Sequence, residues 1–381
     1  QMSEVKDEYK NVAIFGQGYV GLPLSLSFAL RGCNVYGVDV VEKLVNEINN
    51  GITYHTEKFE DKGIREILND ELKNKRYRAT LDFNEAMDVC NNIIVTVGIP
   101  IKNGEYELSD LLDCCRKIGK KLKKGDLIVI RSTVIPGTTE EIILPALEEE
   151  SHMKAGKDFF LAYSSERIAE GKAFEEFAYM PTVVAGINSE SAKRAKELLS
   201  VVCKTEIITA SCIKVVETSK VFENVQRDVN IAMVQEFARF CEAIGIDTFE
   251  VVNVANTHKR VKLLTPGPGV GGYCIPNAYY YIEPKAEEVG VSLDILKLCR
   301  HKNEMLPETI VDMLDGQAKS AGKELKNMKV GILGIAMKDY SNDDRISPPI
   351  EIAKILKERC LKVEAYDPVV PSKYDFKVNS L

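Results

Sequence analysis

The chain has 381 residues, more than one hydrophobic core usually organises, so we expect two or three domains. Its content of 45% apolar and 28% charged residues is ordinary for a globular protein, and no apolar stretch approaches the roughly 18 residues of a membrane helix. The formal charge of −7 disfavours nucleic-acid binding, and the charged residues 2–8 do not resemble a signal peptide. We therefore expect a cytoplasmic protein with no membrane and no nucleic-acid partner.

The first predicted unit is a strand, a glycine turn and a helix. Apolar runs at residues 12–15 and 34–38 flank an apolar helical segment at residues 22–30, which is a βαβ pattern. Four further runs, rich in β-branched residues, alternate with helical segments: 92–97, 126–130, 159–163 and 182–185. Such strands are typical of a parallel sheet buried on both faces. We predict an α/β fold whose residues 1–210 form a Rossmann-type doubly wound domain.

A helical region follows. From residue 211 to Gly245 the helical periodicity has no interruption, and a second helical region extends to about His301. We therefore expect a helical middle domain over residues 211–305. An elongated helical domain has a face that its neighbours leave uncovered, so we also expect a homodimer formed through this domain.

The strand pattern returns near the end of the chain. A strand at residues 330–334, a helix at 349–357 and a strand at 362–366, which ends in Asp367, repeat the opening pattern. We expect residues 306–381 to form a second Rossmann-like domain. It should be incomplete, because the 14 residues after Asp367 are too few for a doubly wound sheet, or the chain has been shortened there.

Three glycines mark the first turn as a dinucleotide-binding loop. Gly16 permits the tight turn, Gly18 lets the backbone approach a pyrophosphate, and Gly21 lets the helix pack against the strand. Asp39 lies 18 residues beyond Gly21, at a strand end where a carboxylate accepts hydrogen bonds from a ribose diol and repels a 2′-phosphate. The pattern favours NAD over NADP, although glycines alone also occur in ordinary tight turns.

Cys274 is the candidate nucleophile. It ends the glycine-dense loop of residues 266–273, where main-chain N–H groups can stabilise a thiolate or an oxyanion. The alternative is a flexible turn with an incidental cysteine. The other cysteines and the four histidines match no zinc-binding spacing, so we expect no metal site.

Two further segments carry polar residues in places suited to a site. Glu217, Lys220, Asn224 and Arg227 share one stripe of the long helix, and an ammonium beside a carboxamide can donate to an oxyanion. The stripe could also be a solvated face with an ion pair. Residues 131–139 begin at a strand end, where open α/β sheets bind ligands, but they could equally be a plain strand-to-helix connection.

Together these segments resemble the UDP-glucose/UDP-N-acetylhexosamine 6-dehydrogenase family across essentially the whole chain. The family-like segments are residues 16–21, 132–139, 165–167 with Gly171, 217–232, His258 with Arg260, 269–274, and Lys338 with Asn342, Asp343, Arg345 and residues 347–348. The resemblance implies an NAD-dependent enzyme that oxidises the C6 alcohol of a UDP-sugar to a carboxylate, through a thiohemiacetal and a thioester on Cys274.

The resemblance also implies a role for each site residue. Lys220 and Asn224 would hold the C6 oxygen, while Thr133 and Glu166 would position water. The residues implied in cofactor binding are Gly16, Gly18, Tyr19, Val20, Gly21, Asp39, Thr96 and Thr133. Those implied in substrate binding are Glu166, Arg167, Lys220, Asn224, His258, Arg260, Gly271, Lys338 and Arg345.

The segment at residues 165–167 is more similar to the N-acetylhexosamine branch. We therefore expect UDP-N-acetylmannosamine as substrate, with UDP-N-acetylglucosamine next and UDP-glucose as the alternative. One departure is Ala278, where the family usually carries an aspartate implicated in proton handling. It leaves open a sugar-nucleotide-binding protein with impaired catalysis. A β-hydroxyacid dehydrogenase is the other alternative, but it needs neither the cysteine nor a third domain.

Overall fold

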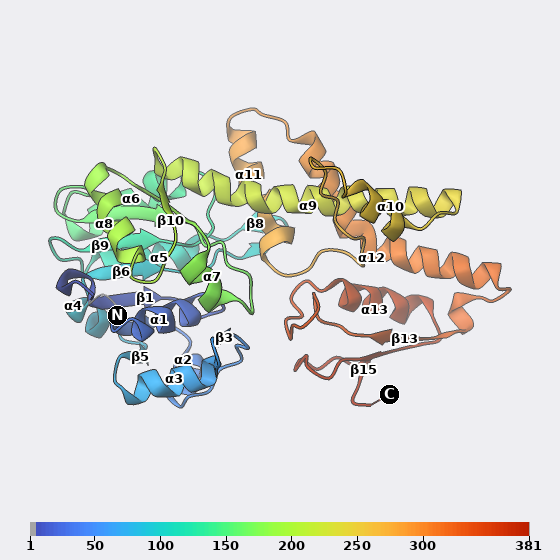
Figure 1. Cartoon of the computed structure of the whole chain (residues 1–381), viewed down its shortest axis with the longest axis horizontal. Helices are drawn as coiled ribbons and strands as arrows, with labels where there is room; N and C mark the ends of the chain where they lie inside the picture. The colour runs from blue at the N-terminus through green and yellow to red at the C-terminus, as the bar shows by residue number, and fades with distance from the viewer. Residues whose placement is uncertain (1–4, 381) are drawn as a thin grey trace. The chain divides into compact units, whose positions relative to one another are not determined.

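The structure is a computed structural model that describes residues 5–380, so the first residues of the charged start lie outside it. The chain divides into two compact units between Lys220 and Val221. The division falls inside one long helix, α9 (Ile213–Ile244). Figure 1 shows the helices and strands with their labels.

The first unit contains an eight-stranded sheet in the order β12-β11-β10-β9-β6-β1-β2-β5. Its strands are β1 (Asn11–Phe15), β2 (Asn34–Val38), β5 (Tyr77–Thr80), β6 (Asn92–Val95), β9 (Leu127–Ile130), β10 (Phe160–Ser164), β11 (Thr182–Gly186) and β12 (Ile207–Thr209). The central strands are buried along their length because helices cover both faces of the sheet (Figure 1). The predicted doubly wound α/β sheet is confirmed.

The helices of this unit are mostly short. They are η1 (Asp7–Tyr9), α1 (Gly21–Leu30), α2 (Glu42–Asn49), α3 (Ile64–Lys73), α4 (Phe83–Val89), α5 (Ser109–Gly119), the π-helix η2 (Thr139–Ile143), α6 (Leu144–Ser151), α7 (Ala173–Tyr179) and α8 (Ser189–Leu199). Two small hairpins pair β3 (Lys58–Phe59) with β4 (Lys62–Gly63), and β7 (Ile101–Lys102) with β8 (Glu105–Tyr106). Helix α1 is apolar on every side and is almost wholly buried, as such a composition requires.

One strand differs from the parallel sheet that the sequence suggests. Strand β11 runs antiparallel to β10, whereas the remaining neighbours in this sheet pair in parallel. Between them the chain forms only the seven-residue α7, which packs against α1. The connection therefore does not carry the chain back along the sheet, and β11 starts at the edge where β10 ends. A β-branched run does not distinguish the two directions.

The second unit is helical in its first part. After α9 come α10 (Thr248–Ala255), α11 (Cys274–Glu288) and α12 (Asp294–Ser320). The uninterrupted periodicity up to Gly245 correctly predicts α9, which at 32 residues is about 48 Å long. The second helical region extends further than expected, because α12 continues as one helix beyond residue 305.

A small parallel sheet closes the chain. It orders β13 (Lys329–Leu333), β14 (Lys362–Tyr366) and β15 (Lys377–Val378), with η3 (Leu325–Asn327) before it and α13 (Pro348–Arg359) packed on it. A core that includes Val311, Ile335, Ile350 and Leu356 joins α12, α13 and the sheet. The predicted strand, helix and strand are confirmed, and β15 is an additional short strand.

The predicted echo between the two ends of the chain extends to individual hydrogen bonds. Gly16 N donates to Val38 O at 2.8 Å, and Gly334 N donates to Tyr366 O at the same distance. Each second strand ends in an aspartate whose side chain accepts from the turn of its own first strand. The second copy is the smaller one, with three strands against eight.

Candidate functional site

The glycine loop has the geometry that a bound pyrophosphate requires. Gly16 has a φ of +92°, which favours glycine, and a Cβ on Gly21 would lie 1.7 Å from Gly16 O. A Cβ on Gly18 would meet no described atom within 4 Å, so open space lies beside this part of the backbone. Tyr19 and Val20 complete the turn into α1. The loop therefore fits the diphosphate of a dinucleotide.

Asp39 and Thr96 hold this loop from the neighbouring strands. Asp39 Oδ2 accepts from Gln17 N at 2.8 Å, and its Oδ1 accepts from Val41 N at 3.0 Å. The Thr96 hydroxyl donates towards Gly16 O at 2.8 Å. Both residues follow strands that flank β1, so the parallel topology brings them to the same edge. The predicted cofactor residues of this region thus lie together.

Thr133 and Glu166 follow the next two strands. Every residue of 131–139 is buried except Thr133, which is partly exposed. Glu166 Oε2 accepts from Arg131 Nη2 at 2.8 Å, and its Oε1 accepts from the backbone N–H of Arg167 and Ile168. Four donors in total, counting Arg131 Nε at 3.1 Å, fix the carboxylate of Glu166. These four hydrogen bonds hold the carboxylate in one orientation at the edge of the sheet.

The sequence did not reveal the role of Arg131. It is 5% exposed and stands directly after β9, at the edge where ligand-binding residues gather. Its partner Glu166 is 35 residues away, so no local pattern indicates the pair. Arg167, expected to bind substrate, donates from Nη1 to Pro181 O at 2.8 Å.

Three of the four residues of the polar stripe on α9 are buried. Glu217 is 0% exposed and Lys220 is 7% exposed. Within residues 5–380 no hydrogen bond or ion pair reaches the Lys220 ammonium. A largely buried lysine whose ammonium has no partner in this part of the chain is suited to a ligand that supplies oxygen atoms. One turn further, Asn224 is 5% exposed.

Arg227, which the spacing also placed on this stripe, is exposed. The next buried polar residue is instead Asp228, which accepts from Asn303 Nδ2 at 2.7 Å and lies 3.4 Å from Arg300. Burial raises the pKa of the Asp228 carboxyl, while Arg300 lowers it. These partners are more than 70 residues away in the chain, so periodicity within α9 could not reveal them.

Cys274 is the first residue of α11 and is exposed. The N-terminal end of a helix carries a partial positive charge that stabilises a thiolate. The glycines before it are required by close packing, since a Cβ on Gly271 would lie 2.7 Å from the Met337 side chain. Four residues later, Ala278 is 2% exposed, so an aspartate there would be buried.

Arg345 lies against the same loop. Its backbone oxygen accepts from Gly272 N at 2.8 Å, and its guanidinium lies 4.7 Å from the ring centre of Tyr273. Asp343 fixes the guanidinium through an ion pair of 2.6 Å. The second unit therefore brings Cys274, Gly271 and Arg345 together, although Arg345 is about 70 residues away in the chain.

Three other predicted residues lie on exposed segments. His258 and Arg260 follow α10, where Arg260 N donates to His258 Nδ1 at 3.2 Å. Lys338 is exposed in the segment after β13. Among the described residues, no group of three or more His, Cys, Asp or Glu side chains could hold a metal ion.

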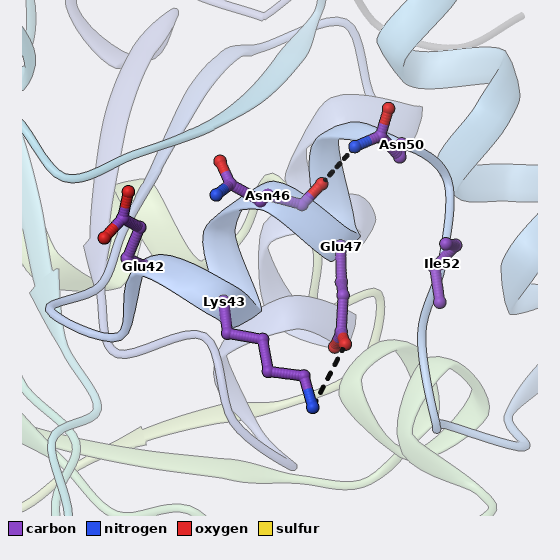
Figure 2. A pocket seen from close by; sticks show the side chains of 6 residues that line it. All are labelled: Glu42, Lys43, Asn46, Glu47, Asn50 and Ile52. Atoms are coloured by element: carbon purple, nitrogen blue, oxygen red, sulfur yellow. Dashed lines mark hydrogen bonds and ion pairs between the residues drawn. The ribbon is translucent and has the colours of Figure 1, made fainter.

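A hollow of about 450 Å³ opens on the surface of α2 (Figure 2). Its lining residues are Glu42, Lys43, Asn46, Glu47, Asn50 and Ile52. Lys43 and Glu47 form an ion pair of 3.8 Å, and Asn50 Nδ2 donates to Asn46 O. None of the predicted site residues lines this hollow, and we assign it no chemistry.

Comparison with known proteins covers almost the whole chain. Three domains of the UDP-glucose/GDP-mannose dehydrogenase family match: the NAD binding domain at residues 10–206, the central domain at 214–305 and the UDP binding domain at 331–380. A UDP-N-acetyl-D-mannosamine dehydrogenase of Pyrococcus horikoshii is 32% identical over 365 residues, which are 96% of this chain and 85% of that protein.

A second relative has a name that gives another substrate, and a solved structure shows a similar fold. A UDP-N-acetyl-D-glucosamine 6-dehydrogenase of Salmonella typhi is 33% identical over 96% of this chain and 84% of its own length. The solved structure of a UDP-D-ManNAc dehydrogenase from Pyrococcus horikoshii superposes with a TM-score of 0.89 at 31% identity, covering 96% of this chain and 85% of that one.

Proposed function

Since this chain belongs to the UDP-glucose/GDP-mannose dehydrogenase family, we propose that it oxidises the C6 alcohol of UDP-N-acetylmannosamine to a carboxylate. The predicted resemblance, the NAD cofactor and the oxidoreductase class are confirmed by the family match. The substrate is the proposed part, because relatives of similar identity act on UDP-N-acetylmannosamine and on UDP-N-acetylglucosamine. The family's UDP binding domain supports a UDP-sugar.

The observation that carries the proposal is the position of Cys274. It is the first residue of α11 and directly follows a loop that packs against Arg345. NAD⁺ serves as hydride acceptor, once for each of two oxidation steps. After the alcohol has become an aldehyde, the thiolate of Cys274 adds to its carbon, and the oxygen takes up a proton. Loss of a second hydride and a proton gives a thioester, and water then releases the carboxylate and the free thiol.

We propose the remaining roles from the local geometry. The ammonium of Lys220 and the carboxamide of Asn224, one turn apart on α9, would hold the C6 oxygen as it gains negative charge. Glu166, fixed by Arg131, would orient the water that attacks the thioester. Thr133 would assist it, and His258, Arg260, Lys338 and Arg345 would bind the sugar nucleotide.

The expected division into domains at residues 210 and 305, the homodimer and the cytoplasmic location also stay proposals. No helix among the described residues is long and apolar enough to cross a membrane. A second candidate function, sugar-nucleotide binding with impaired turnover, is favoured by Ala278 alone, since a methyl group can neither accept a proton nor orient water.

The test counts NADH formed per sugar consumed with UDP-N-acetylmannosamine, UDP-N-acetylglucosamine and UDP-glucose. We expect two NADH per molecule of UDP-N-acetylmannosamine and no acid from Cys274→Ser, because a serine hydroxyl is a far weaker nucleophile at neutral pH. Cys212→Ser, which changes another exposed cysteine, should behave as the wild type. Uronate production by Cys274→Ser at the wild-type rate would exclude the covalent route, and binding of the sugar without NADH formation would favour the second candidate.

A further inference from the structure

Residues 52–57, which we name the strap, lie between α2 and β3 and belong to no helix or strand. Ile52, the residue at the edge of the hollow in Figure 2, begins it. Thr53, His55 and Glu57 are buried, and the residues between them are exposed. The alternation is that of an extended segment with one buried face, but this face is polar, the reverse of the usual pattern. Buried polar side chains persist where they make specific hydrogen bonds.

His55 bonds to the dinucleotide loop. Its Nε2 lies 3.0 Å from Gly18 O, and a carbonyl oxygen only accepts, so Nε2 carries the proton. The other nitrogen, Nδ1, is therefore free to accept from the Thr53 hydroxyl at 2.6 Å. Burial lowers the pKa of His55, which favours this neutral ring, although the nearby Glu57 raises it. Gly18 is the glycine beside which the open space for the diphosphate lies.

Aromatic contacts involve the same histidine ring. The Tyr54 ring stacks on His55 with ring centres 4.4 Å apart, and the Tyr19 ring meets Tyr54 edge-on at 5.0 Å. Tyr19 directly follows Gly18 in the loop. The strap and the dinucleotide loop are thus joined by a half-buried hydrogen bond and by the ring contacts of Tyr54 and Tyr19 beside it.

Glu57 bonds to the segment that carries Glu166. Its Oε1 accepts from Gly171 N at 2.9 Å, while its Oε2 is buried without a hydrogen-bond partner in the described part of the chain. Further bonds hold the strap itself, among them those from Ile64 N to Glu57 O at 2.9 Å and from Arg65 Nε to Thr53 O at 3.2 Å. The strap therefore has fixed ends and one polar side chain directed to each of two loops.

We propose that His55 and Glu57 are positioning residues: His55 sets the dinucleotide loop for NAD binding, and Glu57 sets the Glu166 segment for turnover. Neither residue touches the reacting atoms. The role of His55 rests on NAD binding alone. The role of Glu57 rests on the proposed function, because it needs the role of Glu166.

The test of His55 compares two amide variants of similar size. In His55→Gln the side-chain nitrogen stands where Nε2 stood and can donate to Gly18 O, whereas in His55→Asn it stands near the place of Nδ1 and faces Thr53. We expect His55→Asn to weaken NADH binding about tenfold, because the Gly18 carbonyl loses the donor that holds the loop, and His55→Gln to restore most of the affinity. Thr56→Ala, an exposed neighbour in the strap, is the matched control.

The measurement is a fluorescence titration of NADH, which needs no sugar, with a thermal melt of each variant. Equal NADH affinity of His55→Asn and the wild type would overturn the role of His55, as would a loss of affinity in His55→Gln equal to that in His55→Asn. A chain that binds NADH as expected but oxidises no UDP-sugar would overturn the proposed function and leave this role standing.

The test of Glu57 uses turnover with both substrates saturating. Glu57→Ala removes the acceptor of Gly171 N and should lower kcat about tenfold with a smaller change in NADH affinity. Glu57→Gln keeps an oxygen at the same place and should retain kcat within about threefold. A folded Glu57→Ala variant with wild-type kcat, or one that loses only NADH affinity, would contradict the assignment.

Discussion

Glu217 shows how burial decides the state of a single residue. Its carboxyl is 0% exposed on α9, and one oxygen lies 3.5 Å from Thr139 N. Burial raises its pKa to about 8, and the N–H groups of Thr139 and Gly137 lower it only in part. The residue is therefore largely protonated at neutral pH, three positions before Lys220. Its neutral form places no negative charge beside the ammonium proposed to hold the substrate oxygen.

This residue should make stability depend on pH. Because the folded state binds the proton of Glu217 more tightly than the unfolded chain, its contribution is complete below the ordinary pKa of 4.5 and is lost as pH rises to about 8. Glu217→Gln cannot ionise. As pH rises through this window, the free energy of unfolding of the variant should therefore increase relative to that of the wild type, by an amount on the order of a few kcal/mol.

Urea unfolding at pH 5 and at pH 9 measures the difference between the two proteins. The matched control is Glu242→Gln, which changes an exposed glutamate on the same helix and should give no pH-dependent difference. A gap between Glu217→Gln and the wild type that is equal at both pH values would show that Glu217 does not bind its proton more tightly in the fold.

At the scale of the elements, periodicity and glycine placement predicted most of the fold. The 32-residue α9 and the repeated strand, helix and strand follow from local patterns, because a helix or a buried strand repeats its apolar residues at a fixed spacing. The antiparallel direction of β11 could not be predicted from local patterns, since it depends on where the short helix α7 packs. Strap contacts such as His55 with Gly18 span 37 residues and have no local signature.

The same limit holds for the candidate site. Residues with a distinctive neighbourhood in sequence, such as Gly16 and Cys274, could be named in advance. Contacts such as those of Arg131 with Glu166 and of Arg345 with the Cys274 loop could not, because tertiary packing sets them. The sequence therefore indicates candidate residues, whereas the hydrogen bonds that hold them become visible only in the fold.

The β1–β2 turn gives a prediction on cofactor choice. Asp39 accepts two backbone N–H groups and ends β2, where its charge repels a 2′-phosphate. Asp39→Ala should narrow the preference for NAD over NADP, and it should also weaken NAD binding because the loop loses an anchor. The ratio of kcat/KM for the two cofactors measures the first effect.

The second copy of the turn supplies a matched control for this prediction. Asp367 accepts from Ile335 N and Val369 N as Asp39 does from Gln17 N and Val41 N, so Asp367→Ala should leave the cofactor ratio unchanged. Wild-type protein that used NADP as well as NAD, or an Asp39→Ala variant with an unchanged ratio, would remove Asp39 from cofactor selection.

At the scale of the whole molecule, the helices of the second unit present an apolar surface that the described chain leaves open. Near the end of α9 and in α10 the exposed fractions are 65% for Phe240, 54% for Ile244, 47% for Ile246 and 54% for Phe249. Single exposed apolar residues are ordinary, but a group of four large ones on adjacent elements is typical of a contact surface. A second copy of the chain is the simplest partner, because a twofold axis lets one patch cover itself.

We therefore predict a homodimer that depends on this patch. Phe240→Glu places a charge at its most exposed member, and burying an unpaired carboxylate in an interface is costly, so this variant should sediment as a monomer at concentrations where the wild type is a dimer. Leu333→Glu is the matched control, because Leu333 is 76% exposed on β13, outside the patch, and its change should leave the dimer intact. A wild-type mass that corresponds to a monomer at every concentration would refute the dimer. A dimer that survives Phe240→Glu but dissociates with Leu333→Glu would move the interface from α9 and α10 to the C-terminal sheet.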